Sequence, residues 1–231
     1  MIIAPLQFFG LGDLIFCQTL AADWQKEGDS VLWGVQPEWV EGLSRAYPTI
    51  KFVDKSTLPI DYNNQREHDS HGYRVIPLRW SVEITGVSYD RCMASKYMMF
   101  NQHYMRWREA AMWQRTDERE KALFDKLGLN IGENYILVNE TFQSDLNGRK
   151  VIMPSTKARV VKMRAIEGFS LFDWALVIER AAEVHTVSTS LFYILEMLDL
   201  KQPIHLYPRP NDPRFDHIKY LFTKPYILHY E

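Results

Sequence analysis

Three consecutive hydroxyl side chains, Ser188, Thr189 and Ser190, lie between an apolar run ending at Val187 and a second apolar segment. This order predicts a strand followed by a helix. The first N–H groups of a helix lack intrahelical partners, and the helix dipole adds partial positive charge there. A phosphate group fits such a site, and the hydroxyl groups add hydrogen-bond donors. The simpler interpretation is that one hydroxyl caps the helix. A cap needs only one of the three, and the sequence leaves both interpretations open.

A basic pair, Arg149 and Lys150, follows the strand predicted at residues 134–141. Ligands of open α/β sheets bind at the carboxyl ends of strands, and a guanidinium beside an ammonium suits a diphosphate. From Glu140 to Glu167 the chain has six basic residues against three acidic ones. The stretch therefore predicts a local positive field. A solvated surface loop is the alternative for each of these side chains.

The segment GLGD, residues 10–13, places Gly12 and Asp13 directly after the first apolar run. The dinucleotide fingerprint requires glycine at position 15, which is Ile15, and an acid after the second strand, which ends in Val35 and Gln36. NAD binding is therefore disfavoured. The glycines instead let the loop approach a ligand closely. Asp13 then either begins a helix or accepts a proton from a substrate hydroxyl.

The histidines do not form a recognisable metal motif. His68 and His71 have a suitable spacing, but no third ligand follows in a known pattern. His185 lies in an apolar strand and is predicted to be a hydrogen-bonded core histidine. No D-x-D motif is present, so the sequence predicts no metal and no cofactor. The Met-rich aromatic run at residues 97–113 is predicted to be core.

The elements that must position these residues alternate between strand and helix. Strands are predicted at 2–6, 30–35 and 50–54, with helices at 13–28 and 37–48 between them. The alternation resumes at residue 134, with strands predicted at 134–141, 158–163, 183–187 and 203–208. A helix between the second and third of these opens at Ser170 with Asp173 three residues on, close to a capping box. Between the two blocks we expect a loop at 55–72, a strand at 73–81 and helices at 94–114 and 117–129. This pattern predicts an α/β fold with two small Rossmann-like lobes, residues 1–130 and 131–231, and a helical middle region.

Composition excludes several classes of function. The 231 residues are 46% hydrophobic with a formal net charge of −2, which argues against a nucleic-acid-binding protein. Cys17 and Cys92 are too few for a disulfide framework and are expected to be free thiols. We find no signal peptide and no transmembrane segment, so we expect a cytoplasmic protein. Peripheral membrane contact stays open.

Taken together, the two ends of the chain resemble the heptosyltransferase-like glycosyltransferases of the GT-B fold. At the N-terminus the resemblance lies in Gly12-Asp13 entering a helix after the first strand. Near the C-terminus it lies in the run from SLFDWALVIERAAEVHTV through STSLFYILEMLDL to PIHLYP. Val187-Ser188-Thr189-Ser190 replaces the family's aspartate-serine-glycine motif, the chain has about two thirds of the usual length, and the middle region has no counterpart.

The resemblance implies that a sugar is transferred from a nucleotide-sugar donor to a glycan or other hydroxyl acceptor, without a metal and with inversion. Asp13 corresponds to the catalytic base. Gly12, Arg149, Lys150, Ser188, Thr189 and Ser190 are expected to bind the donor across a cleft between the lobes. The alternative is a non-catalytic nucleotide- or glycan-binding protein that retains the fold. A nucleotide-sugar epimerase is disfavoured because the dinucleotide fingerprint is absent.

Overall fold

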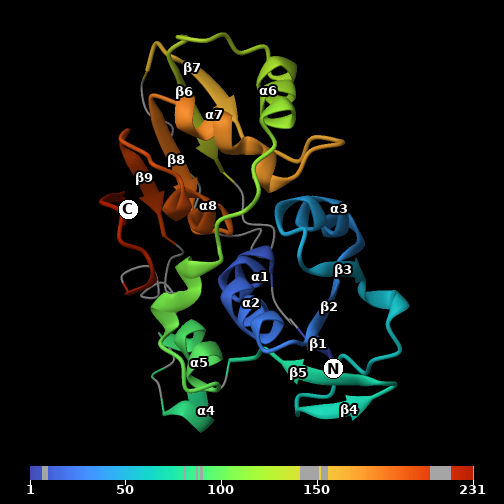
Figure 1. Cartoon of the computed structure of the whole chain (residues 1–231). Helices are drawn as coiled ribbons and strands as arrows, with labels where there is room; N and C mark the ends of the chain where they lie inside the picture. Colours follow the sequence, from blue (N-terminus) through green and yellow to red (C-terminus); the bar gives the residue numbers. More distant parts are fainter. Residues whose placement is uncertain are drawn as a thin grey trace. The chain divides into compact units, whose positions relative to one another are not determined.

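The chain divides into two compact units, Met1–Gln114 and Arg115–Glu231. The computed structural model describes residues 1–6, 10–80, 82–86, 88, 91–140, 151, 156–208 and 220–230 (Figure 1). The sequence placed the boundary between residues 130 and 131. In the structure the helix that precedes that point, α6 (Asp117–Lys126), lies in the second unit.

The first unit is built on a five-stranded sheet with the order β3-β2-β1-β5-β4. The strands are β1 (Ile2–Leu6), β2 (Ser30–Val35), β3 (Lys51–Asp54), β4 (His68–Ser70) and β5 (Tyr73–Pro77). The first three and β5 run parallel, and β4 pairs antiparallel with β5. The predicted alternation is confirmed, and β2 has the predicted bounds.

The helices between these strands are α1 (Leu11–Phe16), α2 (Gln18–Lys26) and α3 (Pro37–Ala46). The helix predicted over 13–28 is divided at Cys17, where the backbone leaves helical geometry. Gly28 ends the segment with a φ of +91°, and Pro37 occupies the first turn of α3, where its missing N–H costs no hydrogen bond.

The loop predicted at 55–72 contains the 3₁₀ turn η1 (Lys55–Thr57) and the strand β4. Ser70 pairs with Tyr73, so His71 and Gly72 form a two-residue hairpin turn with φ values of 49° and 83°. Positive φ at both central residues is the type I′ geometry that matches strand twist. The loop prediction was wrong for residues 68–70. These polar residues show no strand pattern in the sequence, and their strand is recognisable only from its pairing with β5.

The region 94–114 is not a single helix. It contains α5 (Cys92–Met98) and the 3₁₀ helix η3 (Tyr104–Glu109), with α4 (Val82–Thr85) before them. Asn101 has a φ of 55° between the two. The Thr19 hydroxyl on α2 donates to the carbonyl groups of Arg106 and Trp107, which replaces helical hydrogen bonds with tertiary ones.

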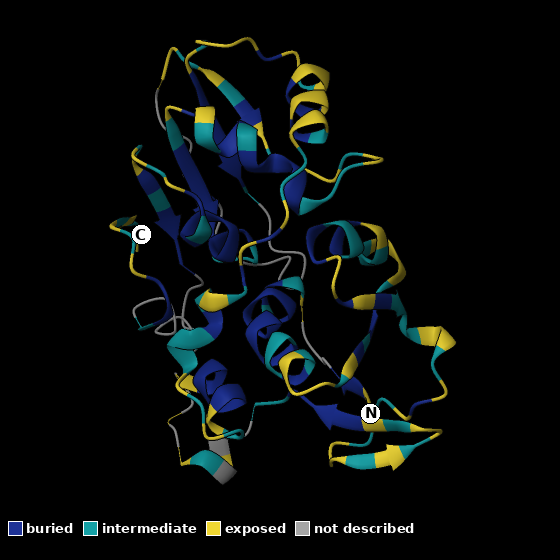
Figure 2. Cartoon of the chain, in the orientation of Figure 1, coloured by how far each residue is buried: buried dark blue, intermediate teal, exposed yellow. Residues whose placement is uncertain are grey.

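The prediction that the aromatic run is core is confirmed in part. Tyr97, Trp107 and Trp113 are buried, whereas Met98 and Met112 are exposed. Phe16 contacts Tyr97 edge-on at a ring-centroid distance of 5.0 Å and lies 6.0 Å from Trp107. The Tyr97 hydroxyl donates to the Phe16 carbonyl over 2.7 Å. Helices α1 and α2 are mostly buried as a result (Figure 2). The middle region therefore forms the support beneath α1.

The second unit has a parallel five-stranded sheet with the order β10-β9-β8-β6-β7. Its strands are β6 (Tyr135–Asn139), β7 (Arg159–Lys162), β8 (Glu183–Val187), β9 (Ile204–Tyr207) and β10 (Tyr226–Leu228). The sequence predicted the first four and missed β10, which is a three-residue strand at the edge of the sheet.

One face of this sheet packs on helices α6, α7 (Ala175–Arg180) and α8 (Leu191–Met197). Tyr135 contacts Phe124 of α6, and its hydroxyl donates to the Val177 carbonyl of α7. The 3₁₀ turn η4 (Leu171–Trp174) precedes α7 and opens with the predicted capping box between Ser170 and Asp173. The helix-facing side of β6 is therefore core, whereas α6 exposes its outer side to solvent (Figure 2).

Candidate functional site: two sheet edges at topological switch points

In each unit the strand order reverses at one point of the sheet. In the first sheet the chain moves from β1 to β2 and β3 on one side, and β5 lies on the other side of β1. In the second sheet β7 lies on one side of β6 and β8 on the other. Ligands of open α/β sheets bind at the carboxyl ends of strands where the order reverses. The two candidate ligand-binding edges are therefore the carboxyl end of β1 in the first unit and the carboxyl ends of β6 and β8 in the second.

Asp13 lies at the first of these edges, in the first turn of α1. Gly10 is the N-cap residue, and no side chain caps this helix. A Cβ atom on Gly10 would meet no atom of the described residues within 4 Å. Gly12 is buried in the same turn. The interpretation of Asp13 as a helix cap is not supported, because its side chain is engaged elsewhere.

That side chain pairs with a buried lysine. Lys96 Nζ donates to Asp13 Oδ1 over 2.7 Å, and the Lys96 side chain is 0% exposed against 17% for Asp13. An ammonium is costly to bury unless it is paired, so Asp13 neutralises Lys96 while Lys96 fixes the orientation of the carboxylate. Sequence reasoning missed Lys96. The available signal was one cation inside an apolar helical stretch, CMASKYMM.

The thiol of Cys17 lies close to this pair. Burial raises the pKa of Cys17 to about 12, although the nearby Lys96 charge lowers it and the Asp13 charge raises it. Desolvation dominates, so the thiol is neutral near neutral pH and is no nucleophile. Both cysteines are free and buried, as the sequence predicted.

The second edge carries neutral hydrogen bonds. Asn139, the last residue of β6, is in register with Thr186 on β8. Its Nδ2 group donates to Thr186 Oγ1 over 2.9 Å and to Thr189 Oγ1 over 3.0 Å. The structure thus ties the carboxyl ends of two neighbouring strands together through one amide. Asn139 was missed because its role depends on strand order.

The three predicted hydroxyl residues lie together directly after β8 and are half-buried. Thr189 Oγ1 accepts a weak hydrogen bond from the Leu191 N–H over 3.4 Å, so Thr189 serves as a partial cap of α8. Ser190 is the N-cap residue without a side-chain hydrogen bond. Within the part of the chain that the structure describes, the hydroxyl groups of Ser188 and Ser190 have no hydrogen-bond partner.

The basic pair cannot be placed, because Arg149 and Lys150 lie outside the described residues. Two other members of the predicted positive field have structural partners. Arg159 donates to the carbonyl groups of Leu127 and Gly128 at the end of α6. Lys162 pairs with Glu140 over 2.8 Å. These two cations stabilise the second unit and add little to a positive field.

Comparison with known proteins yields likeness in structure and not in sequence. No family model and no curated protein sequence matches the chain. A family 9 glycosyl transferase from Veillonella parvula is 13% identical with a TM-score of 0.56, over 99% of this chain and 86% of that chain. The bacterial iron-containing dodecameric glycosyltransferase TibC from enterotoxigenic E. coli is 12% identical with a TM-score of 0.55. This second match covers 89% of the present chain and 57% of TibC.

The present chain has the fold of the heptosyltransferase-like glycosyltransferases. TibC in complex with ADP-D-beta-D-heptose gives the same result, with 9% identity and a TM-score of 0.51 over 90% of this chain and 57% of that chain. The predicted fold class, with two Rossmann-like units, is confirmed. Among the described residues, no helix is long and apolar enough to cross a membrane.

Proposed function

We propose that the protein is a glycosyltransferase that moves a sugar from a nucleoside-diphosphate-sugar to a hydroxyl acceptor, with inversion and without a metal in the reaction. The observation that carries this proposal is the Asp13 carboxylate at the switch point of the first sheet. It is partly exposed and is held in place by the buried Lys96. The likeness in fold to glycosyltransferases supports it.

Asp13 acts as the general base in this mechanism. Its carboxylate removes the proton of the acceptor hydroxyl while the acceptor oxygen forms a bond to the anomeric carbon. The bond from that carbon to the diphosphate oxygen breaks in the same displacement, which inverts the anomeric configuration. Lys96 holds Oδ1, and this leaves Oδ2 as the oxygen that receives the proton. A positioned base of this kind is worth about 10²–10⁴-fold in rate.

The second edge binds the diphosphate of the donor. Hydroxyl donors at Ser188 and Ser190 hydrogen-bond its oxygens, and Asn139 keeps Thr189 in position beside them. Hydrogen bonds to developing negative charge lower the barrier when their donors are fixed in advance. We also assign Arg149 and Lys150 to the leaving diphosphate, on the basis of their sequence position alone.

Donor identity is the first experiment. A ligand that binds only the folded state raises the melting temperature, so UDP-, GDP-, ADP- and TDP-sugars can be compared directly. ADP-D-beta-D-heptose is the first to test, because a structure of TibC is described in complex with it. We expect one nucleotide class to stabilise the protein and to yield free nucleoside diphosphate in the presence of an acceptor. Binding without any release would favour the non-catalytic alternative.

Chelation tests the metal independence of the reaction. We expect transfer activity to persist after EDTA treatment, because the base and the diphosphate ligands are all protein groups. Complete loss of activity with EDTA, restored by Mg²⁺ or Mn²⁺ while the melting temperature stays unchanged, would show that this part of the proposal is wrong.

A further inference from the structure

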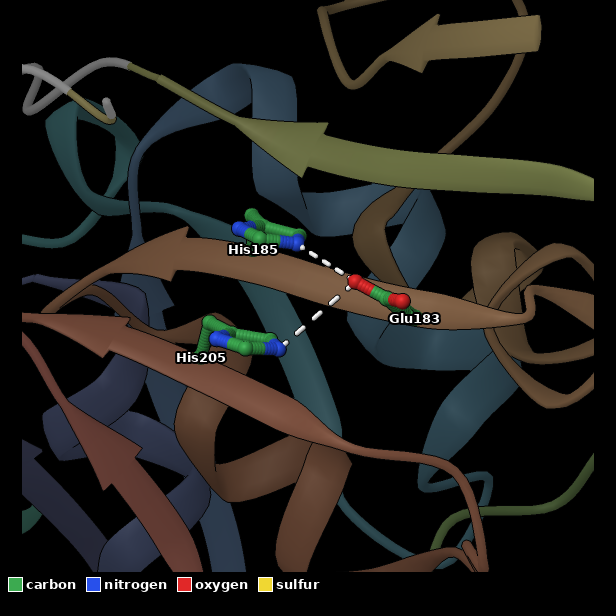
Figure 3. A group of neighbouring side chains, drawn as sticks. All are labelled: Glu183, His185 and His205. Carbon is green, nitrogen blue, oxygen red and sulfur yellow. Dashed lines mark hydrogen bonds and ion pairs between the residues drawn. The ribbon is translucent and has the colours of Figure 1, made fainter. Parts of the chain in front are cut away.

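Two histidines and a glutamate meet on the face of the second sheet opposite the helices. His185 on β8 is in register with His205 on β9, so both side chains project from the same face. Glu183 lies two residues before His185 on β8 and therefore shares that face. Figure 3 shows both imidazole rings presenting an edge nitrogen to the Glu183 carboxylate.

The distances suit a single bound cation. Glu183 Oε2 lies 3.1 Å from His185 Nε2 and 3.6 Å from His205 Nε2, and the three atoms all lie within 4.8 Å of one another. Tetrahedral Zn²⁺ with bonds of about 2.0–2.1 Å separates its ligand atoms by about 3.3–3.4 Å. The two imidazole rings are parallel, with centroids 4.2 Å apart, so their Nε2 atoms point the same way and both rings must turn for these atoms to bind one ion.

The outer partners of both rings can serve a metal-bound state. His185 Nδ1 lies 3.1 Å from the Tyr207 hydroxyl, and His205 Nδ1 lies 2.9 Å from His229 Nε2. A hydroxyl group and an imidazole nitrogen can each accept a hydrogen bond as well as donate one. Each Nδ1 can therefore carry the proton and donate it outward, which frees Nε2 for a metal. Such outer hydrogen bonds orient ligating histidines in known metal sites.

Access to solvent also favours binding. The side chains of Glu183, His185 and His205 are 39%, 3% and 18% exposed. The site is thus buried at His185 and open to solvent at Glu183, where an ion can enter and a water can complete its coordination.

From this geometry we propose that Glu183, His185 and His205 form a binding site for a divalent transition metal of the zinc type, which links β8 to β9. Imidazole and carboxylate ligands suit Zn²⁺ better than Mg²⁺. The proposal is independent of the proposed transferase activity. The role of the bound metal is structural. Glu183 begins β8, and Ser188, Thr189 and Ser190 follow the other end of that strand.

Metal titration of the full-length, tag-free protein after chelator treatment tests the site. We expect one Zn²⁺ per chain by calorimetry, and the intense visible absorption of four-coordinate Co²⁺ on substitution. Loss of an outer partner costs about 10–100-fold in metal affinity, so loss of a direct ligand costs about 100-fold or more. We expect that loss for His205→Gln and Glu183→Gln, and about a 10-fold loss for Tyr207→Phe.

The matched control is His68→Gln on β4, which removes a half-exposed histidine of the first unit. It should bind Zn²⁺ like the wild type. Melting temperatures in EDTA establish that each variant is folded, and Zn²⁺ should raise the melting temperature of the wild type but not of His205→Gln. Equal Zn²⁺ affinity in wild type and His205→Gln, or no stoichiometric binding to the wild type, would overturn the proposal.

Discussion

The carboxyl edge at β1 and the carboxyl edge at β6 and β8 differ in charge. The first holds the ion pair of Asp13 with the fully buried Lys96. The second holds neutral hydrogen bonds from Asn139 to two threonine hydroxyls. A fixed carboxylate suits proton transfer, whereas neutral hydrogen-bond donors suit an incoming anion. The same position in the two sheets thus carries an ion pair in one unit and neutral hydrogen bonds in the other.

The largest expected effect concerns the base. Because Asp13→Asn alone breaks the ion pair and keeps the buried Lys96 charge, the informative variant is Asp13→Asn with Lys96→Met, which removes both charges. We expect its turnover to fall by about 100-fold or more at a near-normal melting temperature. Donor affinity, measured by calorimetry on the same sample, should change little. Near-normal turnover in this double variant would reduce the ion pair to a structural role.

The next effect is on stability and tests the charge of the first edge directly. Asp13→Asn removes the Asp13 charge from beside the buried Lys96 ammonium, which should cost about 3 kcal/mol in the free energy of unfolding, the lower part of the range for a broken buried pair. The double variant should recover most of that loss. A single variant as stable as the wild type in urea unfolding would show that Lys96 does not depend on the Asp13 charge.

A smaller effect is expected at the second edge. Ser188→Ala and Ser190→Ala each remove a hydroxyl that has no hydrogen-bond partner among the described residues, so we expect the melting temperature to stay unchanged. A hydrogen bond to a charged group is worth about 1.5–3 kcal/mol, so each substitution should weaken donor binding by about 10-fold or more. Ser70→Ala on β4 is the control and should bind donor normally. Unchanged donor affinity in both serine variants would remove these hydroxyls from the site.

The last prediction is that the Cys17 thiol is not alkylated in the folded protein. With a thiol pKa of about 12, only roughly one thiol in 10⁴ is ionised at pH 8. We therefore expect the folded protein to resist iodoacetamide at pH 8 and to react at both cysteines once unfolded, as followed by mass spectrometry. Rapid alkylation of Cys17 in the folded state would show that the core around Asp13 and Lys96 is open to solvent.

The sequence by itself determined the elements whose signals are local. The strand at 30–35, Pro37 at the start of α3, Gly28 at the end of α2 and the capping box at Ser170 all depend on residues a few positions apart. It also placed Asp13 and the hydroxyl residues that follow Val187 at changes from strand to helix, because such a change is visible in hydrophobic periodicity.

Only the tertiary structure decided which groups surround those residues. Lys96 lies 83 positions from Asp13, and Asn139 lies 50 positions from Thr189. His185 and His205 meet because the register of β8 with β9 aligns them. The short edge strands β4 and β10 exist through hydrogen bonds to their neighbours. Strand order, register and the burial of a charge arise from packing between distant segments, and local periodicity carries no information about them.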